Sequence, residues 1–367
     1  MNAPKLRFKE FNDEWKKAQI SSFVNINPKN DSLPEKFVYI DLESVNNGLL
    51  TSRKVINKSE APSRAQRTIV KNDILYQTVR PYQMNNLFIN RLDSDYPYIA
   101  STGYALLRTE ENPYFLYSIL YQKAFVNKVL NMCTGTSYPA ISANDLGTIF
   151  VCLPSIREQE KISRTLELLD KKIELQSKKI EDLKLFKKGL STTIFNSLRD
   201  FKEYKLGKIC NITTGKLDAN AMIDNGKYRF YTCAKEYSLI DKYAFDTEAL
   251  LISGNGAYVG YIHYYKGKFN AYQRTYVLDN FSQNIQFIKC YLEENLAKRI
   301  NSEKKEGNTP YIVLSTLSDM VIKIPSKENQ IKISNIINCH NKKIELEENK
   351  LLKLQELKKG LMQSMFV

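Results

Sequence analysis

The chain contains two copies of one long segment, and this internal repeat limits its fold more than any other feature. Residues 154–195 match residues 325–366 at a constant offset of 171, with 18 identities in 42 positions and no gap. The same offset continues upstream with weaker identity. The starts of the two halves match instead at an offset of 189, where Glu14-Trp15-Lys16 faces Glu203-Tyr204-Lys205. The sequence therefore predicts two homologous halves, the second lacking about 18 residues of the first.

Both copies of the repeat have the apolar spacing of a coiled coil. Apolar residues recur at alternating steps of four and three residues over about five heptads, with Gln176 and Lys187 as polar interruptions. A helix of ~37 residues is about 55 Å long, too long to be packed within one small domain. We expect the two helices to pair antiparallel with each other; a coiled coil between two copies of the chain is the alternative. The seam positions are Ile162, Leu166, Leu169, Ile173, Ile180, Leu183, Leu190 and Ile194, then Ile333, Ile337, Ile344, Leu351, Leu354, Leu361 and Met365.

The segments that precede the long helices predict two mixed α/β domains. Short β-branched or alternating runs are separated by turn signals such as Asn47-Gly48 and Asn225-Gly226. One helix is expected in each domain, over 113–132 and 284–301. The strands are expected at 37–42, 73–79, 98–107 and 149–153, then at 228–233, 249–253, 259–265, 272–278 and 321–324.

The predicted fold class is therefore α+β, with two mixed α/β domains separated by two long helices that form an antiparallel coiled coil, in a pseudo-two-fold repeat. The predicted limits are 1–153 for the first domain with its N-terminal lead-in and 154–198 for the first helix. The second domain is expected at 199–324 and the second helix at 325–367.

Charge points to a polyanionic partner. The 367 residues include 54 Lys and Arg against 40 Asp and Glu, a formal net charge of +14. Such an excess favours nucleic acid first and anionic membrane second. There are 2 His and 6 Cys, and no two Cys have C-x-x-C spacing, so zinc and a disulfide framework are not expected. No apolar run approaches a membrane span of ~18 residues, and residues 1–14 do not resemble a signal peptide. We expect a cytoplasmic protein.

Two motifs could suggest an enzyme, and neither is sufficient. Residues 253–260 have the spacing G-x-G-x-x-x-G, which differs from both common nucleotide loops, and a strand-like segment follows where a helix would be needed. A hairpin or a loop near a phosphate is expected there. Residues 112–115, Asn-Pro-Tyr-Phe, resemble a methyltransferase tetrapeptide, but no glycine-rich cofactor loop accompanies them, and Pro at a helix start explains them. The sequence predicts no catalytic residue, no metal site and no cofactor.

Basic residues are interleaved with aromatic and amide residues in two stretches. Residues 53–91 contain eight Lys and Arg against Glu60 and Asp73, and residues 264–275 contain three against none. Arg, Lys, Gln and Asn read base edges, and Lys and Tyr reach phosphates. The alternative for any single residue is a solvated surface position or a core tyrosine. The predicted DNA-binding residues are Arg53, Lys54, Arg64, Arg67, Gln77, Arg80, Tyr82, Gln83, Thr136, Tyr138, Lys216, Arg229, Asn255, Tyr258, Lys266, Tyr272, Gln273, Arg274 and Asn308.

Four features together give the chain a family resemblance. Residues 6–11, Leu-Arg-Phe-Lys-Glu-Phe, are followed closely by Trp15; proline and then Gln-x-Lys-Ile opens each long helix; and Lys-Lys-Gly-Leu closes each. Residues 271–275, Ala-Tyr-Gln-Arg-Thr, resemble a recurrent element of target-recognition domains, from which their counterpart 100–104 departs. Over essentially its whole length the chain resembles a type I restriction-modification specificity subunit.

The resemblance implies a non-catalytic DNA-binding subunit. Each domain would read one half of a bipartite site on double-stranded DNA, and the paired helices would set the gap. The implied partners are two methyltransferase subunits, which use S-adenosylmethionine, and restriction subunits, which use ATP and Mg to translocate and cleave DNA. Two alternatives remain open at this point: a self-contained methyltransferase or nuclease with an unfamiliar site, and a coiled-coil scaffold without a DNA function.

Overall fold

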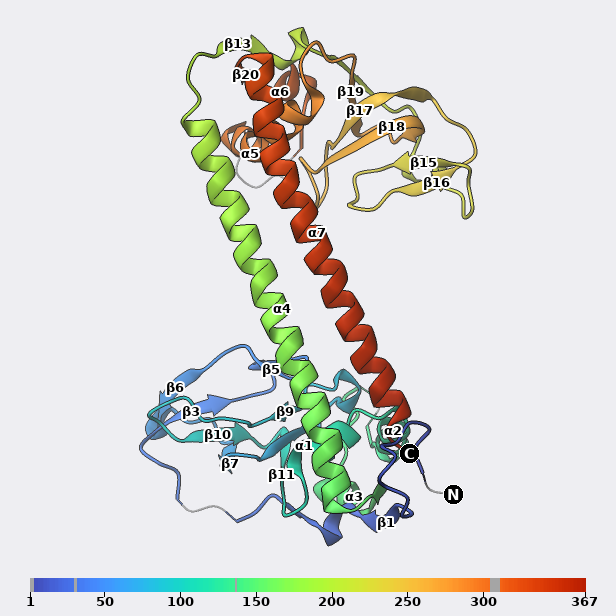
Figure 1. Cartoon of the computed structure of the whole chain (residues 1–367). Coiled ribbons are helices and arrows are strands. Elements are labelled where there is room, and N and C mark those ends of the chain that lie inside the picture. The colour runs from blue at the N-terminus through green and yellow to red at the C-terminus, as the bar shows by residue number, and fades with distance from the viewer. Residues whose placement is uncertain (1–2, 30–31, 136, 304–310) are drawn as a thin grey trace. The chain divides into compact units, whose positions relative to one another are not determined.

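The computed structural model describes residues 3–29, 32–135, 137–303 and 311–367, and it divides into two compact units. Unit 1 comprises Met1–Gln176 with Lys350–Val367, and unit 2 comprises Ser177–Asn349. Two long helices, α4 (Ile156–Asn196) and α7 (Lys327–Ser364), belong to both units: one end of each helix lies in unit 1 and the other end in unit 2 (Figure 1). Both helices begin two residues after a proline of the repeat, Pro154 or Pro325.

The heptad seam is confirmed within each unit. Seam residues of both helices are buried or half-buried, including the polar Gln176, while their neighbours at other heptad positions are mostly exposed. In unit 1, Asp170 of α4 forms an ion pair with Lys358 of α7 at 2.5 Å. In unit 2, Lys179 pairs with Glu347 at 2.5 Å, and Phe186 lies 5.2 Å from the His340 ring. Residue numbers rise along one helix as they fall along the other, so the helices run antiparallel, as predicted.

Unit 1 contains two four-stranded sheets and two strand pairs. The first sheet has the order β6-β3-β10-β7, with β10 parallel to β3; the second has the order β2-β11-β8-β9. β1 pairs with β12, the strand that leads into α4, and β4 pairs with β5. The strands are β1 (Lys16–Gln19), β2 (Val24–Ile26), β3 (Lys36–Ile40), β4 (Val45–Asn46), β5 (Leu49–Leu50), β6 (Lys54–Asn57), β7 (Ala65–Ile69), β8 (Ile74–Gln77), β9 (Leu87–Phe88), β10 (Tyr98–Ser101), β11 (Tyr104–Thr109) and β12 (Phe150–Leu153).

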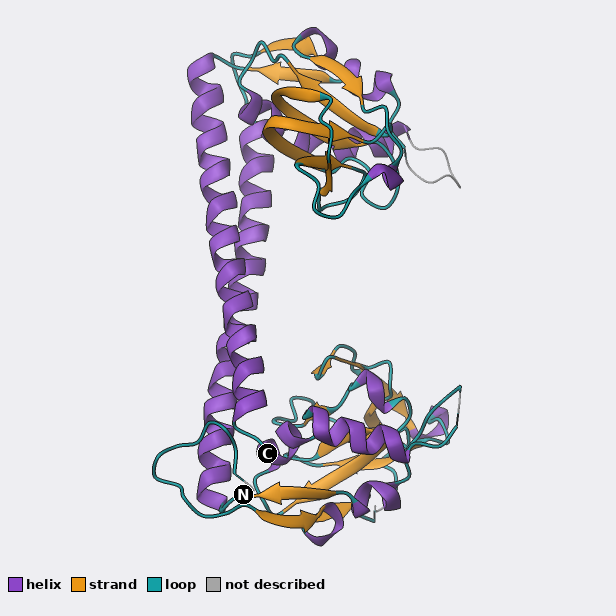
Figure 2. Cartoon of the chain, turned by 90° about the vertical axis from the view of Figure 1, so that its right-hand side faces the viewer, coloured by secondary structure: helices purple, strands orange, loops and turns teal. Residues whose placement is uncertain are grey.

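Unit 2 contains a single six-stranded sheet, of order β14-β19-β17-β18-β15-β16, with α5 (Ile285–Glu303) packed against it (Figure 2). β13 pairs with β20, the strand that leads into α7, as β1 pairs with β12 in unit 1. The strands are β13 (Lys202–Lys205), β14 (Asn211–Thr214), β15 (Tyr228–Tyr231), β16 (Ser238–Ile240), β17 (Phe245–Ser253), β18 (Ile262–Ala271), β19 (Thr275–Asp279) and β20 (Val321–Ile324).

The registers show that the two units repeat one topology. Leu107 and Leu278, which correspond at the offset of 171, lie opposite Ile74 of β8 and Leu250 of β17. Counting along these strands places Gln77 of unit 1 at the position of Ser253 in unit 2. β10 lies parallel to β3 as β18 lies parallel to β15. The duplication read from the sequence is therefore a duplication of the fold.

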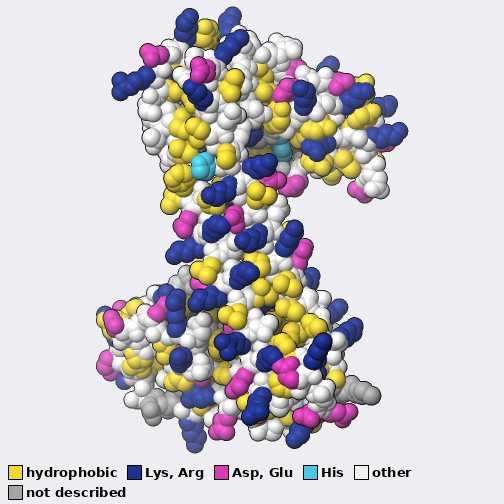
Figure 3. Space-filling view, viewed as in Figure 1, with side chains coloured by type: hydrophobic (Ala, Val, Ile, Leu, Met, Phe, Trp, Pro, Cys, Tyr) yellow, Lys and Arg dark blue, Asp and Glu magenta, His cyan; other side chains and the backbone are white. Residues whose placement is uncertain are grey.

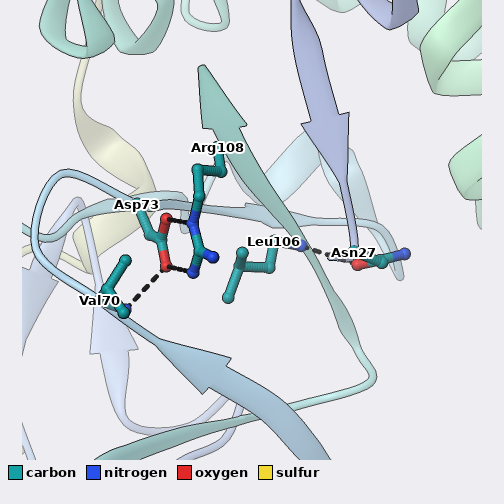
Figure 4. Close-up of polar contacts among 5 residues, drawn as sticks. All are labelled: Asn27, Val70, Asp73, Leu106 and Arg108. Carbon is teal, nitrogen blue, oxygen red and sulfur yellow. Dashed lines mark hydrogen bonds and ion pairs between the residues drawn. The ribbon is translucent and has the colours of Figure 1, made fainter. Parts of the chain in front are cut away.

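One strand of unit 2 is divided in unit 1. β17 is continuous and pairs with both β18 and β19, whereas its counterpart is broken into β7 and β8 by a turn over residues 70–73. Asp73 closes that turn: its carboxylate accepts the Val70 N–H at 2.8 Å and two donors of Arg108 at 2.8 Å each (Figure 4). Asp73 is 0% exposed. Because an ionised carboxylate is costly to bury without partners, these bonds allow the acid to stand where unit 2 has Ala249.

Three sequence predictions about local elements are corrected. The helix predicted over 113–132 is broken at residues 120–122 into α1 (Pro113–Ile119) and α2 (Lys123–Met132), and the strand predicted over 98–107 turns at residues 102–103. One helix per domain is also wrong, because short helices α3 (Ala143–Thr148) and α6 (Leu314–Ser318) precede β12 and β20. The helix predicted over 284–301 is confirmed as α5, whose first turn is capped by the Asn284 side chain.

Candidate nucleic-acid interface

Three segments meet at one end of the sheet in unit 1. They are residues 78–86 after β8, the turn between β10 and β11, and residues 137–141 before α3. Thr78 joins the three, because its N–H donates to the Gly103 carbonyl at 3.0 Å and its own carbonyl accepts the Ile141 N–H at 3.1 Å. We call this the strand-end region of unit 1. It gathers residues that are far apart in the sequence around one backbone position.

Unit 2 has the same strand-end region, formed by residues 254–261, the turn between β18 and β19, and the segment before α6. Gly254 takes the place of Thr78: its N–H donates to the Arg274 carbonyl at 2.9 Å and its carbonyl accepts the Ile312 N–H at 2.8 Å. A Cβ on Gly254 would lie 2.4 Å from the Arg274 carbonyl oxygen, so this close approach requires glycine. Residues 254–261 connect the antiparallel β17 and β18, and the predicted hairpin is confirmed.

Predicted DNA-binding residues of the first domain are concentrated in the strand-end region. The Arg80 guanidinium lies 4.3 Å from the centroid of the Tyr138 ring, which is 65% exposed, and Tyr82 is 49% exposed. Gln83 is also exposed. Arg80 has a φ of 55°, a left-handed conformation that is uncommon for a residue with a side chain. Strained backbone of this kind is concentrated at functional sites.

Gln77 has a different role from its predicted neighbours. Its side chain is 1% exposed, and its amide bonds to the backbone and side chains of residues 79–86. It cannot touch DNA without leaving these partners. We therefore assign Gln77 a structural role: it fixes the loop and does not itself contact DNA.

The remaining predicted residues of the first domain lie on strands or edges away from residues 78–86. Arg53 forms an exposed ion pair with Asp93 at 3.0 Å, and Lys54 is exposed on β6. Arg64 is exposed just before β7. Arg67, on β7, is half-buried; burial lowers the pKa of its guanidinium, and its Nε has no hydrogen-bond partner in the described part of the chain.

In unit 2, the turn between β18 and β19 presents the predicted Gln273 and Arg274, both exposed. The Gln273 Nε2 donates to the Asp218 carboxylate at 2.6 Å. Tyr272 is half-buried, and its N–H donates to the Tyr231 carbonyl at 2.9 Å. These bonds fix the turn backbone and leave the Arg274 side chain at the surface.

The loop after β17 carries the predicted Asn255 and Tyr258. Asn255 forms an isolated bridge with Tyr311, and the Tyr258 ring, 43% exposed, lies 5.3 Å from the Lys235 Nζ. Lys235 was not predicted. The contact joins two loops of unit 2 in a cation–π pair, which presents a positive charge beside an exposed ring.

Arg229 is enclosed by aromatic side chains. Its guanidinium lies 4.3 Å from the Tyr237 ring centroid and 4.6 Å from that of Tyr265, and it donates to the Tyr231 hydroxyl at 3.4 Å. That hydrogen bond raises the pKa of Arg229. With two rings against its guanidinium and a hydrogen bond to a third, Arg229 holds the aromatic cluster together, and we assign it a structural role instead of a direct contact with DNA.

Sequence analysis missed part of the charged and aromatic surface of unit 2. Lys216 and Lys266 were predicted and are exposed, and Lys266 forms an ion pair with Glu248 at 3.5 Å. The missed pair is Lys268 over the Tyr243 ring at 4.8 Å. The signal was present, because Tyr264, Lys266 and Lys268 alternate along one strand. The predicted Thr136 and Asn308 lie outside the described residues.

Surface charge is positive but spread out. Lys and Arg side chains are distributed over the visible face of each unit, with acidic side chains between them (Figure 3). The described residues contain no group of three or more His, Cys, Asp or Glu that could hold a metal ion. Within the same residues, none of the helices combines the length and apolar character needed to cross a membrane.

Comparison with known proteins gives a family match that repeats as the fold repeats. The model described as "Type I restriction modification DNA specificity domain" matches twice, over residues 12–185 and 199–356. The specificity subunit of the type I restriction enzyme EcoDI of Escherichia coli is 36% identical over 165 residues, 45% of this chain and 36% of that protein. The HindI specificity subunit of Haemophilus influenzae is 28% identical over 146 residues, 38% of this chain and 31% of that protein. The chain thus spans about a third of the length of these two relatives.

Solved structures share the fold over the whole chain. The S subunit of a type I restriction-modification system from M. genitalium matches with a TM-score of 0.67 and 20% identity, covering 100% of this chain and 99% of that one. A chain from a structure on complex assembly and conformational transition of the type I R-M system matches with a TM-score of 0.58 and 20% identity, covering 96% and 97%. The predicted fold class is confirmed.

Proposed function

The chain belongs to the family of type I restriction-modification DNA specificity domains, and from this premise we propose that it selects the DNA sequence on which such a system acts. Each unit binds one half of a bipartite site in double-stranded DNA through its strand-end region. The relatives that it matches are named specificity subunits, which agrees with a non-catalytic role.

One observation carries this proposal. Two copies of one topology present different side chains in equivalent strand-end regions: Arg80, Tyr82 and Gln83 in the loop after β8 of unit 1, and Tyr258 in the loop after β17 and Arg274 in the β18–β19 turn of unit 2. Arg and Gln donate to base edges in the major groove, and Tyr and Lys contact the backbone. Two similar scaffolds with unlike exposed residues are suited to two unlike half-sites.

The chemistry belongs to partners in this proposal. Two methyltransferase subunits use S-adenosylmethionine to methylate adenine in the recognised site, and restriction subunits use ATP and Mg. The methyl-accepting base has to leave the duplex for such a reaction, and a subunit bound to both half-sites would hold the flanking DNA. Because its substrate is DNA inside the cell, we place the complex in the cytoplasm.

The test is selection from a randomised pool of duplex DNA by the full-length chain, purified with its methyltransferase subunits. The expected motif has two specified half-sites separated by an unspecified gap, and methylome sequencing of a host that expresses the same complex should return the same motif. A contiguous motif, or none, would contradict the proposal. A chain that alone binds S-adenosylmethionine or cleaves DNA with Mg would favour the enzyme alternative instead.

Salt dependence supplies a second measurement. If Lys and Arg of both units neutralise phosphates, log Kd should change linearly with log salt concentration, by about 0.9 for each phosphate contact. A single-unit interaction would give about half the slope of the full chain. This can be measured with duplexes that contain one half-site or both.

A further inference from the structure

The loop over residues 79–86 of unit 1 is hydrogen-bonded to one buried side-chain amide, that of Gln77. The Gln77 Nε2 donates to the Val79 carbonyl and to the Gln83 Oε1, each at 2.8 Å, and its Oε1 accepts the Asn85 N–H at 3.1 Å. Its own N–H donates to the Asn86 Oδ1 at 2.8 Å. A single side chain thus contacts both ends and the middle of the loop, which we call the reading loop.

These bonds set the direction of the Gln83 amide. The Asn85 N–H can only donate and the Val79 carbonyl can only accept, so the Gln77 amide has one allowed orientation. Its second Nε2 hydrogen then faces Gln83, which has to present its oxygen. The Nε2 amino group of the exposed Gln83 is left as the end of that side chain available to a ligand.

The backbone of the reading loop is also fixed. Arg80 and Met84, with φ of 55° and 52°, bracket the short 3-10 helix Pro81–Gln83. The Arg80 N–H donates to the Pro139 carbonyl at 2.8 Å. The Tyr121 hydroxyl of the α1–α2 junction lies within hydrogen-bond distance of the Asn86 and Met84 carbonyls, at 3.0 and 3.2 Å, and can donate to either. Left-handed backbone at two residues with side chains persists only where surrounding bonds impose it.

The side chain of Arg80 is also held in position by a neighbour. Its guanidinium lies over the exposed Tyr138 ring, 4.3 Å from the ring centroid, and this cation–π contact does not use the guanidinium N–H groups as hydrogen-bond donors. The loop therefore offers donors from two neighbouring side chains. Guanine presents two acceptors, O6 and N7, in the major groove, whereas bidentate reading of adenine by Gln needs both the amide oxygen and the amide nitrogen.

We propose that the reading loop recognises a guanine in the half-site of unit 1, with Arg80 and Gln83 as base-reading residues and Gln77 as their positioning residue. This inference rests on the proposed function and adds the kind of base edge that the loop accepts. Unit 2 lacks the device, because Ser253 stands at the position of Gln77 and is too short to reach across a loop.

The sharpest test reverses the polarity at position 83. In Gln83→Glu one carboxylate oxygen keeps the bond from Gln77, and the other turns an acceptor outward. The expected result is loss of guanine at one position of one half-site and its replacement by cytosine, whose N4 amino group donates. Gln83→Ala should relax the same position and weaken binding about tenfold. Because Gln83 is exposed, neither variant removes an apolar core contact; Gln83→Ala removes only the acceptor of one Gln77 hydrogen bond, which Gln83→Glu keeps.

Gln77→Met tests the positioning role, since it keeps the volume and removes the amide. The freed Gln83 amide can then turn either way, so the position should accept adenine as well as guanine. The matched control for Gln83→Glu is Gln355→Glu, which makes the same charge change at an exposed site of α7. It should leave the selected motif as it was. The readout is the motif selected from a randomised duplex pool by the full complex.

The outcomes separate this inference from the proposed function. A bipartite wild-type motif that is unchanged in Gln83→Glu, or that has no guanine in the half-site affected by Gln83→Ala, would overturn the guanine assignment and leave the specificity role intact. A wild-type complex that selects no motif would overturn both. A guanine-to-cytosine change confined to one half-site would support the assignment.

Discussion

The two units share one chain path and differ at the position where the central strand enters the strand-end region. In unit 1, Gln77 ends β8 and its side chain holds the reading loop through three hydrogen bonds. In unit 2, Ser253 ends β17, 0% exposed, and the loop turns sharply through Gly254, which lies against the Arg274 backbone. The repeated scaffold carries two loops that are shaped by different means, so one fold can read two unlike sequences.

The sheets of the two units also share one topology and differ in a local feature. β17 is continuous in unit 2, whereas its counterpart in unit 1 is interrupted by the turn that Asp73 and Arg108 close (Figure 4). Both versions keep the parallel pairing of β10 with β3 and of β18 with β15. The core pairings therefore tolerate a break in one strand when its buried polar groups are paired.

The largest effect should come from exchanging a whole domain. Replacing residues 15–153 with the same segment of another family member should change one complete half-site and leave the other as it was. The reason is that the strand-end region of unit 1 lies within this segment. Methylome sequencing measures the outcome, and a change in both half-sites would show that the two units do not read DNA independently.

The next largest effect should come from breaking the Asp73–Arg108 ion pair, which closes the turn over residues 70–73. Arg108→Met leaves the buried Asp73 carboxylate without its partner and should lower the free energy of unfolding of unit 1 by about 3 kcal/mol. Arg53→Met is the control, because its ion pair with Asp93 is exposed and surface ion pairs contribute little to stability. The chain has a single tryptophan, Trp15, buried in unit 1, so its fluorescence in urea reports that unit. Equal losses for the two variants would refute the structural role of the buried pair.

Two arginines at the strand-end regions should give smaller and separable effects on DNA binding. Arg80→Ala and Arg274→Ala should each weaken binding by about 1–3 kcal/mol and relax one position, in different half-sites. Competition binding with single-base variants of the selected duplex measures both quantities. If neither variant changes affinity or motif, both residues should be removed from the interface. If both relax the same half-site, the assignment of one unit to each half-site is wrong.

The repeated architecture was predictable from the sequence because identity and heptad spacing are both local and periodic. The antiparallel pairing of α4 with α7 was preferred because a folded domain joins the two copies and lets them fold back on each other, whereas the seam alone also allowed a coiled coil between two chains. The strand breaks have turn-type residues in the sequence, Lys71-Asn72-Asp73 and Thr102-Gly103, but the strand predicted over 98–107 ran through the second of them. The short helix α3 is one turn capped by the Ser142 hydroxyl, which accepts the Asp145 N–H at 3.0 Å, and one turn has too few residues to show periodicity.

The candidate site was only partly predictable. Composition singled out 77–83 and 272–274, where Arg, Tyr and Gln are concentrated, and the structure places both stretches at or beside the strand-end regions. Composition could not separate Gln77 from Gln83, which differ in burial and not in type. Nor could it pair Arg229 with Tyr237 and Tyr265, which come from different parts of the chain and meet only when the sheet has formed.

The smallest effect concerns pH, and it again separates the two units. Both histidines, His263 and His340, lie in unit 2, and unit 1 has none. Burial lowers the pKa of His263, outweighing the opposing effects of the Ala234 carbonyl, which its Nε2 contacts at 2.9 Å, and of Glu236. The neutral ring packs against the rings of Tyr231 and Tyr261. Below the ordinary histidine pKa of about 6.5 the unfolded chain binds a proton more readily than folded unit 2 does.

Unit 2 should therefore lose stability as pH falls from 7.5 to 5.5, and unit 1 should lose none from histidine. Hydrogen exchange of β18 amides reports unit 2, while Trp15 fluorescence reports unit 1. In His263→Gln, whose amide can donate to the Ala234 carbonyl, the extra exchange of β18 at pH 5.5 should shrink, whereas His340→Gln on α7 should behave as the wild type. An undiminished acid effect in His263→Gln would assign it to carboxylates instead, and it would remove this difference between the two units.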